Sequence, residues 1–438
     1  MHDAPTGPAQ PPPPPVSMTR LAAASLAGTA IEFYDFFIYG TAAALVLGPL
    51  FFPTFSPLAG TLAAFGTFGI GFIARPLGSV LFGHIGDRRG RRPVLIGSLL
   101  LTGGATVAVG CVPTYDAIGV FAPLLLLVLR FLQGLGLGGE WGGAVLLTAE
   151  HAPAAKRGLW SSFPQIGPSV GFLLANGVML ALTAGLSDAQ FAAWGWRVPF
   201  WAAGLLAVAG LWLRHAVTET PHFLGVQEHA RVPLFEVVRG HGRLVLLTAG
   251  SMAIGYAIFY TVSTWALAYG TEQLGVARTV MLTCIMAAVA IKGALTPFAA
   301  MLGDRFGRRP LCMAGAGAAA LWMFPLIGLL STGEPLLMFC GFLVALLAFI
   351  TMFSVLAAYL PELYEPRVRC TGAAVGYNLG GVLGGALTPI VATAVAGHSD
   401  GPPWTVAAYL TVIALLSLGC FALLPETRPA AVREPASA

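Results

Sequence analysis

Long apolar stretches separated by short polar breaks constrain this chain more than any other feature. A helix needs about 20 apolar residues to cross a bilayer, and the sequence divides into about twelve such stretches. Only 10% of the residues are charged, whereas soluble domains carry roughly 25%. We therefore predict an all-α membrane protein with twelve transmembrane helices. The predicted spans are 21–47, 58–83, 92–112, 118–148, 158–184, 194–216, 243–270, 278–301, 310–331, 335–360, 371–397 and 404–425.

The distribution of positive charge predicts the orientation. Most of the 23 Lys and Arg residues fall in the N-terminal tail, in alternate loops and in the C-terminal tail. Cytoplasmic loops are enriched in these residues, so we expect both termini to be cytoplasmic. Residues 1–19 include the run Pro11 to Pro15 and lack the pattern of a signal peptide. We expect a disordered, proline-rich cytoplasmic tail there.

Two sequence echoes indicate a duplicated unit. GHIGDRRGRRP at 83–93 is echoed by GDRFGRRP at 303–310, with Asp87 and Asp304 217 residues apart. AEHAPAAKRG at 149–158 is echoed by PELYEPRVRCTG at 361–372, with Glu150 and Glu362 212 residues apart. We therefore predict two six-helix bundles, 20–216 and 243–425. A cytoplasmic linker at 217–242 would join them, and 426–438 would be a cytoplasmic tail.

Several motifs carry a family resemblance. The two GDRxGRRP loops and RFLQGLGLGG, which begins at Arg130, resemble signatures of the major facilitator superfamily. Five further segments are similar to the metabolite:proton symporters of that superfamily, which include transporters of proline and betaine, 2-oxoglutarate, shikimate and citrate. These segments are EFYDFFIYG at 32–40, FIARPLGSVLFG at 72–83, GLGGEWGGA at 136–144, WGWRVPF at 194–200 and YLPELYEPRVRCTG at 359–372. The resemblance implies proton-coupled transport by alternating access in a bacterial cytoplasmic membrane.

Charged residues inside the predicted spans are candidates for coupling, because charges in lipid usually face a cavity. Glu32 and Asp35 are three residues apart and share a helix face near mid-bilayer. Burial disfavours a charged carboxylate and a nearby cation favours it, so such a group can exchange a proton. The resemblance associates Arg130 with the same role. The alternative is a permanent ion pair of these acids with Arg130 or Lys292.

Other intramembrane residues are candidates for substrate binding. Arg75 offers a fork of donors that matches a carboxylate. Lys292 is a compact, titratable group that could bind a second carboxylate or pair with Glu32. The uncharged polar candidates are Gln133, Gln165, Asn176, Tyr256, Tyr260 and Asn378.

Charged residues at the cytoplasmic ends of the spans predict a gate. The positive-inside pattern explains the arginines but not an aspartate at the same place in each cluster. We expect salt bridges that form when the protein faces outward and break when it opens inward. The gate residues are Asp87, Arg88, Arg91, Arg92 and Glu150 in the first half, and Asp304, Arg305, Arg308, Arg309 and Glu362 in the second.

Other chemistries lack their motifs. The sequence has no GxxxxGK[ST] or HExxH motif and no CxxC pair, so we expect neither an enzyme nor an ATP-driven pump. We expect no metal, other cofactor or nucleic acid. The predicted partners are an anionic or zwitterionic small molecule, protons and the lipid bilayer. Proton-coupled export or exchange would use the same charges, and a solute sensor would keep the fold without net transport.

Overall fold

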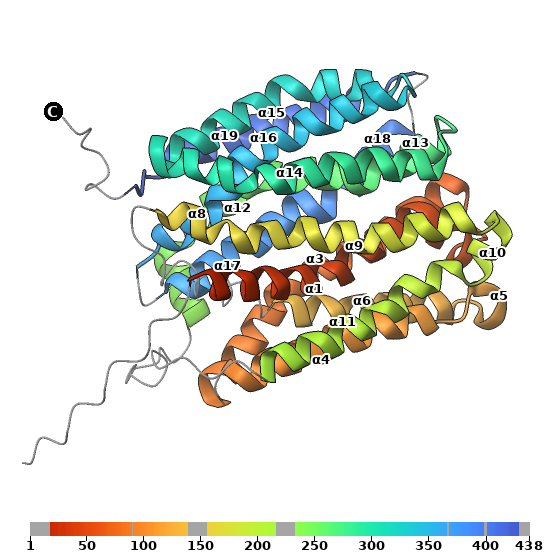
Figure 1. Ribbon diagram of the computed structural model, residues 1–438, viewed down its shortest axis with the longest axis horizontal. Coiled ribbons are helices and arrows are strands. Elements are labelled where there is room, and N and C mark those ends of the chain that lie inside the picture. Colours follow the sequence, from red (N-terminus) through yellow and green to blue (C-terminus); the bar gives the residue numbers. More distant parts are fainter. Residues whose placement is uncertain are drawn as a thin grey trace, which may run out of the picture.

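The computed structural model describes residues 18–89, 91–138, 156–215, 233–365, 368–397 and 401–428. Within these ranges all regular secondary structure is helical, and Figure 1 shows the long helices side by side along the longest axis. The first half contains α1 (Met18–Ala42), η1 (Ala43–Leu47), α2 (Gly48–Phe51), α3 (Pro57–Arg89), α4 (Arg91–Cys111), α5 (Tyr115–Ile118), α6 (Phe121–Gly138), α8 (Arg157–Ser161), α9 (Phe163–Gly185), α10 (Asp188–Ala193), η3 (Gly195–Arg197) and α11 (Val198–His215).

The second half of the chain repeats this pattern of long helices. It contains α12 (Pro233–Tyr260), η5 (Thr261–Trp265), α13 (Ala266–Glu272), α14 (Arg278–Phe306), α15 (Arg308–Leu330), α16 (Pro335–Glu362), α17 (Arg369–Gly380), η6 (Gly381–Ala386), α18 (Leu387–Ala396) and α19 (Trp404–Leu423).

The composition of these helices is that of a multi-pass membrane protein. In the described part of the chain, ten helices are long and apolar enough to cross a membrane. A shorter apolar segment, Ile96–Cys111, lies in α4, and α11 packs against it. Large apolar side chains point outward: Leu205 is 76% exposed and Leu321 is 82% exposed. Exposing such surface to water is unfavourable by roughly 25 cal/mol per Å², so these faces suit lipid.

Several boundaries differ from those expected. The helices extend beyond the predicted spans 58–83 and 278–301, because α3 continues to Arg89 and α14 to Phe306, while the candidate membrane span in α3 is Pro57–Phe82. α12 begins at Pro233, inside the predicted linker, and is kinked at His241, whose φ is −128° and ψ 20°. Proline is tolerated in the first turn of a helix, so Pro233 can start α12. Residues 1–17, 139–155, 216–232 and 429–438 lie outside the described part of the structure. The predictions for the two tails, for most of the linker and for the end of the fourth span concern these residues.

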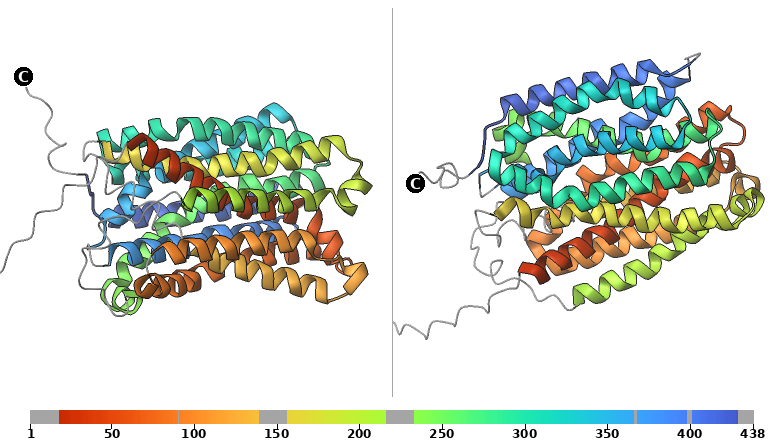
Figure 2. Two further views of the ribbon diagram at one scale, coloured as in Figure 1. Left: turned by 60° about the horizontal axis from the view of Figure 1, so that its bottom comes forward. Right: turned by 45° about the horizontal axis from the view of Figure 1, so that its top comes forward.

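The helices pack mainly within their own half of the chain. In the first half α1 packs against α9, and α6 packs against α3 and α4; in the second, α15 packs against α16 and α19. The halves meet where α9 contacts α14 and where α3 contacts η6 and α18. The three views in Figures 1 and 2 agree with this arrangement.

Two wide helical turns repeat the internal offset of the sequence. The π-helical segments η1 and η5 begin at Ala43 and Thr261, 218 positions apart. This offset is nearly that of Asp87 and Asp304. Single π turns often mark functional positions in helices, and here each one continues the first long helix of its half. The local geometry therefore supports the duplication inferred from sequence.

Glycines bring α6 against α3. A Cβ added to Gly138 would lie 2.0 Å from the Arg75 carbonyl oxygen, and one added to Gly134 would lie 2.2 Å from that of Gly71. Small residues at such spacing allow helix backbones to touch in membranes. The glycine-rich motif that follows Arg130 thus holds Arg130 and Arg75 in neighbouring helices at close range.

Substitution of Gly78 tests this packing. A Cβ at Gly78 would lie 2.0 Å from the Leu135 carbonyl oxygen, whereas one at Gly66 in the same helix meets nothing within 4 Å. Gly78→Ala should destabilise the protein by about 1–3 kcal/mol through overpacking and lower the thermal unfolding midpoint in detergent. The matched Gly66→Ala variant should keep the wild-type midpoint. Equal midpoints for the two variants would contradict the close α3–α6 contact.

Candidate functional site

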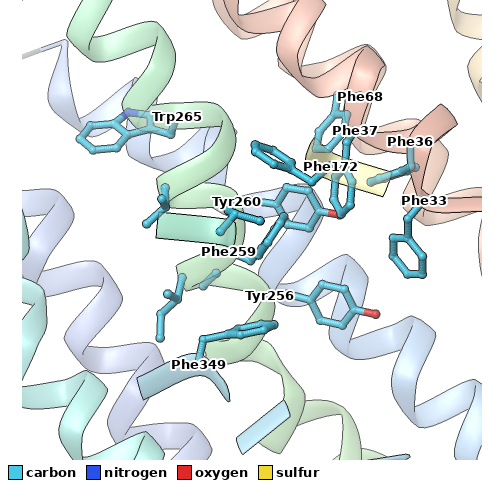
Figure 3. Packing of buried hydrophobic residues seen from close by; sticks show 14 of the residues in the cluster. Phe33, Phe36, Phe37, Phe68, Phe172, Tyr256, Phe259, Tyr260, Trp265 and Phe349 are labelled. Atoms are coloured by element: carbon cyan, nitrogen blue, oxygen red, sulfur yellow. The ribbon is translucent and has the colours of Figure 1, made fainter. Parts of the chain in front are cut away.

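The two halves meet around a cluster of aromatic side chains (Figure 3). From the first half, Phe36, Phe68 and Phe72 place their ring centroids 6.1, 5.4 and 5.3 Å from that of Tyr260 in α12. Tyr256 lies one turn earlier, and its ring is stacked on that of Tyr260 with an interplanar angle of 4°. The predicted tyrosine pair therefore lies at the interface of the halves and takes part in its packing.

Two buried arginines share one aromatic ring. The guanidinium carbons of Arg75 and Arg130 each lie 4.2 Å from the centroid of Phe36. Arg130 has no exposed surface, and it also lies 4.4 Å from the centroid of Tyr39. Aromatic faces attract cations, so these rings replace part of the hydration that the guanidinium groups lose.

Gln133 connects Arg130 to α1. Its side-chain oxygen accepts a hydrogen bond from Arg130 Nη1, and its amide nitrogen donates to the Asp35 carbonyl oxygen at 3.1 Å. The same nitrogen donates to Thr106 Oγ1 at 2.7 Å. Gln133 is therefore a positioning residue for Arg130 in this structure, in addition to being a substrate-binding candidate.

Both arginines keep unused donors. Among the described residues, Arg75 Nε and both Nε and Nη2 of Arg130 have no hydrogen-bond partner. An unsatisfied buried donor is unfavourable by about 1–3 kcal/mol. A ligand with acceptor oxygens could remove this penalty by binding there.

The predicted acids are buried on α1 together with these cations. Glu32 and Asp35 are both buried. The described salt bridges join Arg278 to Asp188, and Arg308 to Asp304 and Glu362. Glu32 and Asp35 also have interaction partners, so a permanent ion pair of these acids with Arg130 or Lys292 stays the alternative considered from sequence.

Lys292 lies at the contact between α14 and α9. Its ammonium nitrogen donates to Ser169 Oγ at 2.9 Å and lies 4.9 Å and 5.4 Å from the ring centroids of Phe349 and Phe259. The side chain is 2% exposed. Lys292 therefore bridges the halves by one hydrogen bond to a neutral hydroxyl group.

The uncharged polar candidates are all buried, and two of them bridge the halves. Gln165 donates to the Phe353 carbonyl oxygen at 3.0 Å, and Asn378 donates to Ser79 Oγ at 3.2 Å. Asn176 instead accepts from Thr41 at 2.7 Å within the first half. The hydrogen bonds of Gln165 and Asn378 would therefore break if the halves separated, whereas Asn176 links two helices of one half.

At the end of the bundle where α1 begins and α19 ends (Figure 1), Asp304 closes the interface. Its two carboxylate oxygens accept from the backbone N–H groups of Gly158 and Leu159, each at 3.0 Å. Buried Arg308 contacts Asp304 at 2.6 Å and Glu362 at 3.7 Å. Three predicted gate residues of the second half therefore gather at one point.

Two other arginines predicted for this gate make different contacts. Arg305 lies against the ring of Phe306, with 5.4 Å from its guanidinium carbon to the ring centroid. Arg309 donates to the Ala422 carbonyl oxygen. The side chains of Asp87, Arg88, Arg91 and Arg92, and the whole of Glu150, lie outside the described part of the structure.

Sequence reasoning missed Glu426, which it assigned to the tail. Its carboxylate accepts from the backbone N–H groups of Arg308 at 3.0 Å and Arg309 at 2.9 Å. The first turn of a helix leaves such groups without intrahelical partners. An acidic residue near the start of α15 was therefore a reasonable expectation, although nothing in the sequence showed that it would come from beyond α19.

The opposite end of the bundle is also joined, by residues that were not predicted. Thr61 Oγ1 lies 3.3 Å from both carboxylate oxygens of Glu272, and Arg278 pairs with Asp188 at 3.0 Å. Asp188 is 93% exposed in its side chain, and exposed pairs contribute little. Two cavities of about 560 and 530 Å³ open at this end, and Glu272 lines both. Neither cavity is lined by Glu32, Asp35, Arg75, Arg130 or Lys292.

The two halves of this membrane-spanning bundle enclose buried charged groups and contact each other at both ends. This is the construction of a transporter. Models of two families, "Sugar (and other) transporter" and "Major Facilitator Superfamily", match residues 21–233 and 271–438. The inner membrane metabolite transport protein YhjE of Escherichia coli K12 is 42% identical over 420 residues, covering 94% of this chain and 95% of YhjE. The shikimate transporter of the same organism is 36% identical over 417 residues, covering 94% and 95%.

The chain therefore belongs to the major facilitator superfamily of transporters, and it is not an enzyme. Solved structures have the same fold. A partially occluded, inward-open structure of the E. coli xylose transporter XylE aligns with a TM-score of 0.74 at 22% identity, over 94% of this chain and all of XylE. A D-xylose–proton symporter structure aligns with a TM-score of 0.71 at 21% identity, covering 94% and 99% of the chains.

Hydrogen exchange tests the closure by Asp304. In Asp304→Asn the backbone amides of Gly158 and Leu159 lose a charged acceptor, and charge-assisted hydrogen bonds contribute about 1.5–3 kcal/mol. Peptides that cover residues 156–162 should exchange at least about tenfold faster than in the wild type. The control is Asp188→Asn, which changes the other end of the bundle. Equal protection of α8 in Asp304→Asn and wild type would show that this carboxylate does not hold the interface.

Proposed function

We propose that this protein is a proton-coupled symporter that imports a small, carboxylate-bearing metabolite across a bacterial cytoplasmic membrane. The observation that carries the proposal is the pair of buried arginines, Arg75 and Arg130. Among the described residues, Arg75 Nε and both Nε and Nη2 of Arg130 have no hydrogen-bond partner. An unsatisfied buried donor is unfavourable by about 1–3 kcal/mol, and the acceptor oxygens of an anionic substrate can satisfy these donors. The shikimate transporter among the relatives is named for a carboxylate.

The proposed topology has twelve spans with both termini in the cytoplasm. The ten candidate spans together with α4 and α11 supply the twelve helices, divided into bundles at 20–216 and 243–425. Arg308 and Arg309 lie at the bundle end where α1 begins and α19 ends, and the positive-inside rule assigns such an end to the cytoplasm. The name of YhjE places that relative in the inner membrane.

Alternating access would use the two sets of contacts between the halves. Opening toward the cytoplasm breaks the bonds of Asp304 to α8, while the contact of Thr61 with Glu272 holds the other end. Opening toward the outside breaks the contact of Thr61 with Glu272, while the bonds of Asp304 to α8 hold the cytoplasmic end. Each set consists of a few hydrogen bonds with net contributions of about 1 kcal/mol apiece. Substrate and proton can therefore bias the equilibrium between the states through modest differences in affinity.

The proposed coupling group is formed by Glu32, Asp35 and Arg130. The two acids lie on α1, and Gln133 ties Arg130 to the backbone of Asp35. A proton on either acid would change the electrostatic balance around both arginines. The solved D-xylose–proton symporter is a protein of the same fold that couples transport to protons.

Uptake by proteoliposomes tests the substrate class. With an inward proton gradient, wild-type protein should accumulate at least one carboxylate from a panel headed by shikimate, and should not accumulate neutral xylose. Arg75→Ala should weaken binding of that carboxylate by at least about tenfold, since a lost charge-assisted hydrogen bond contributes about 1.5–3 kcal/mol. The control is Arg243→Ala, which removes an exposed arginine. Accumulation of xylose alone, or gradient-driven efflux of the carboxylate, would refute carboxylate import.

Neutral substitutions on α1 test the coupling group. Glu32→Gln or Asp35→Asn removes a titratable proton without changing side-chain shape, so the responsible variant should still exchange substrate across the membrane. It should no longer concentrate substrate in response to a pH gradient. Exchange and gradient-driven uptake are measured in the same vesicles, with thermal unfolding as a check on folding. A variant that concentrates substrate as well as the wild type excludes that residue.

A further inference from the structure

Lys292 differs chemically from the two buried arginines. It is one of two lysines in the chain. An arginine keeps its proton in proteins, whereas a buried lysine can lose it. The neutral amine is also compatible with the surroundings observed, which are one serine hydroxyl group and two phenylalanine rings. Lys292 can therefore exist in two charge states at a site where arginine has only one.

The amine lies at the contact that must loosen during transport. Lys292 belongs to α14 in the second half, and its partner Ser169 belongs to α9 in the first. Next to it, Gly293 lets the helices approach, because an added Cβ would lie 2.9 Å from the Ser169 Cβ. A change of charge at Lys292 therefore alters the interactions between the two halves.

The elements packed against α14 bring no close counter-ion. α9 carries no titratable side chain. On α16, Cys340, Tyr359 and Glu362 are nine or more residues from Phe349, which marks the level of Lys292. This separation corresponds to about 13 Å or more along the helix.

Other titratable groups lie on α12, α14 and α1. On α12, Tyr256 and Tyr260 are close in sequence to Phe259, whose ring lies against Lys292. On α14 itself, Cys284 is eight residues from Lys292 and Asp304 is twelve, or about 12 and 18 Å. The charged residues of α8, α13 and α15 lie toward the ends of the bundle. Glu32 and Asp35 lie on α1, which also packs against α9, and the described salt bridges include none between either acid and Lys292.

We propose that Lys292 is the residue at which the substrate carboxylate and a coupling proton bind together. In the empty transporter the amine is neutral. When the carboxylate arrives from outside, the amine takes up one proton, and an ammonium–carboxylate pair forms between the halves. After the transporter opens inward the carboxylate leaves, the ammonium gives up its proton to the cytoplasm, and the neutral amine is restored. This inference rests on the proposed function and specifies the residue that binds the carboxylate and takes up one proton with it. A proton carried by the coupling group on α1 would be additional.

The physical basis is mutual stabilisation of the two ligands. Burial disfavours the charged form of an amine, and an adjacent anion favours it. Proton and carboxylate therefore each raise the affinity for the other, as thermodynamic linkage requires. At the Lys292 site a monocarboxylate would bind with one proton, and this site would carry no net charge before or after binding.

The test measures binding and proton uptake together in the full-length protein in detergent. Shikimate and other carboxylates are titrated calorimetrically between pH 6 and 9 in buffers with different ionisation enthalpies. The wild type should take up one proton per carboxylate bound above the pH at which the free amine titrates. Its dissociation constant should rise about tenfold per pH unit there, as linkage to one proton predicts. Ser169→Ala should retain this pH dependence.

Lys292→Arg separates charge from titration. This variant should bind the carboxylate with a dissociation constant that is constant over the same pH range and without proton uptake. In vesicles it should exchange substrate and concentrate it less than the wild type does at the same pH gradient. Lys292→Gln should lose at least about tenfold in affinity at pH 6, because a buried carboxylate without a counter-ion is unfavourable. Thermal unfolding verifies that each variant is folded.

Comparison with the α1 variants decides the remaining outcomes. If Lys292→Arg keeps wild-type proton uptake, or if Glu32→Gln or Asp35→Asn abolishes that uptake, the proposal for Lys292 is overturned. If both Lys292 variants are folded but bind no carboxylate, unchanged proton uptake in the two α1 variants supports the proposal. Failure of every carboxylate to bind the wild type would instead refute the proposed function itself.

Discussion

The constraint on which this structure depends is the penalty for placing charge in a medium without water. Arg75, Arg130 and Lys292 are almost completely buried. Their surroundings are aromatic faces, one side-chain amide and one hydroxyl group. These groups replace hydration only in part, as the unsatisfied donors of Arg75 and Arg130 show. The unsatisfied donors are the feature that the proposed binding of an anionic substrate would use.

The same constraint explains how the helices are arranged around the centre. Glycines bring the backbone of α6 against that of α3, which places two guanidinium groups on the ring of Phe36. The polar bonds described between the halves are few. Lys292 to Ser169, Gln165 to Phe353 and Asn378 to Ser79 lie between the ends, Asp304 joins one end, and Glu272 and Arg278 join the other. An interface of this kind holds the halves together without preventing one end from opening.

Much of the fold could be predicted because the lipid bilayer restricts which residues a membrane-spanning segment can contain. Spans of apolar residues, rare buried charges and arginines at one end all follow from the energetics of lipid and water. The identity of each buried charge was therefore visible in the sequence. Their partners were not, because the stacking on Phe36, the bond of Gln133 to α1 and the contact of Lys292 with Ser169 depend on which helix faces which. Glu426 and Glu272 were missed for the same reason, since each acts on a helix distant in sequence.

The central claim, symport of a carboxylate with protons, is tested most directly by following protons themselves. Proteoliposomes are loaded with a pH-sensitive dye and start with equal pH on both sides, and the carboxylates are then added outside. We predict acidification of the interior that needs the protein, saturates with the carboxylate that binds, and is absent with xylose. Uptake of that carboxylate with no change in interior pH would contradict the account.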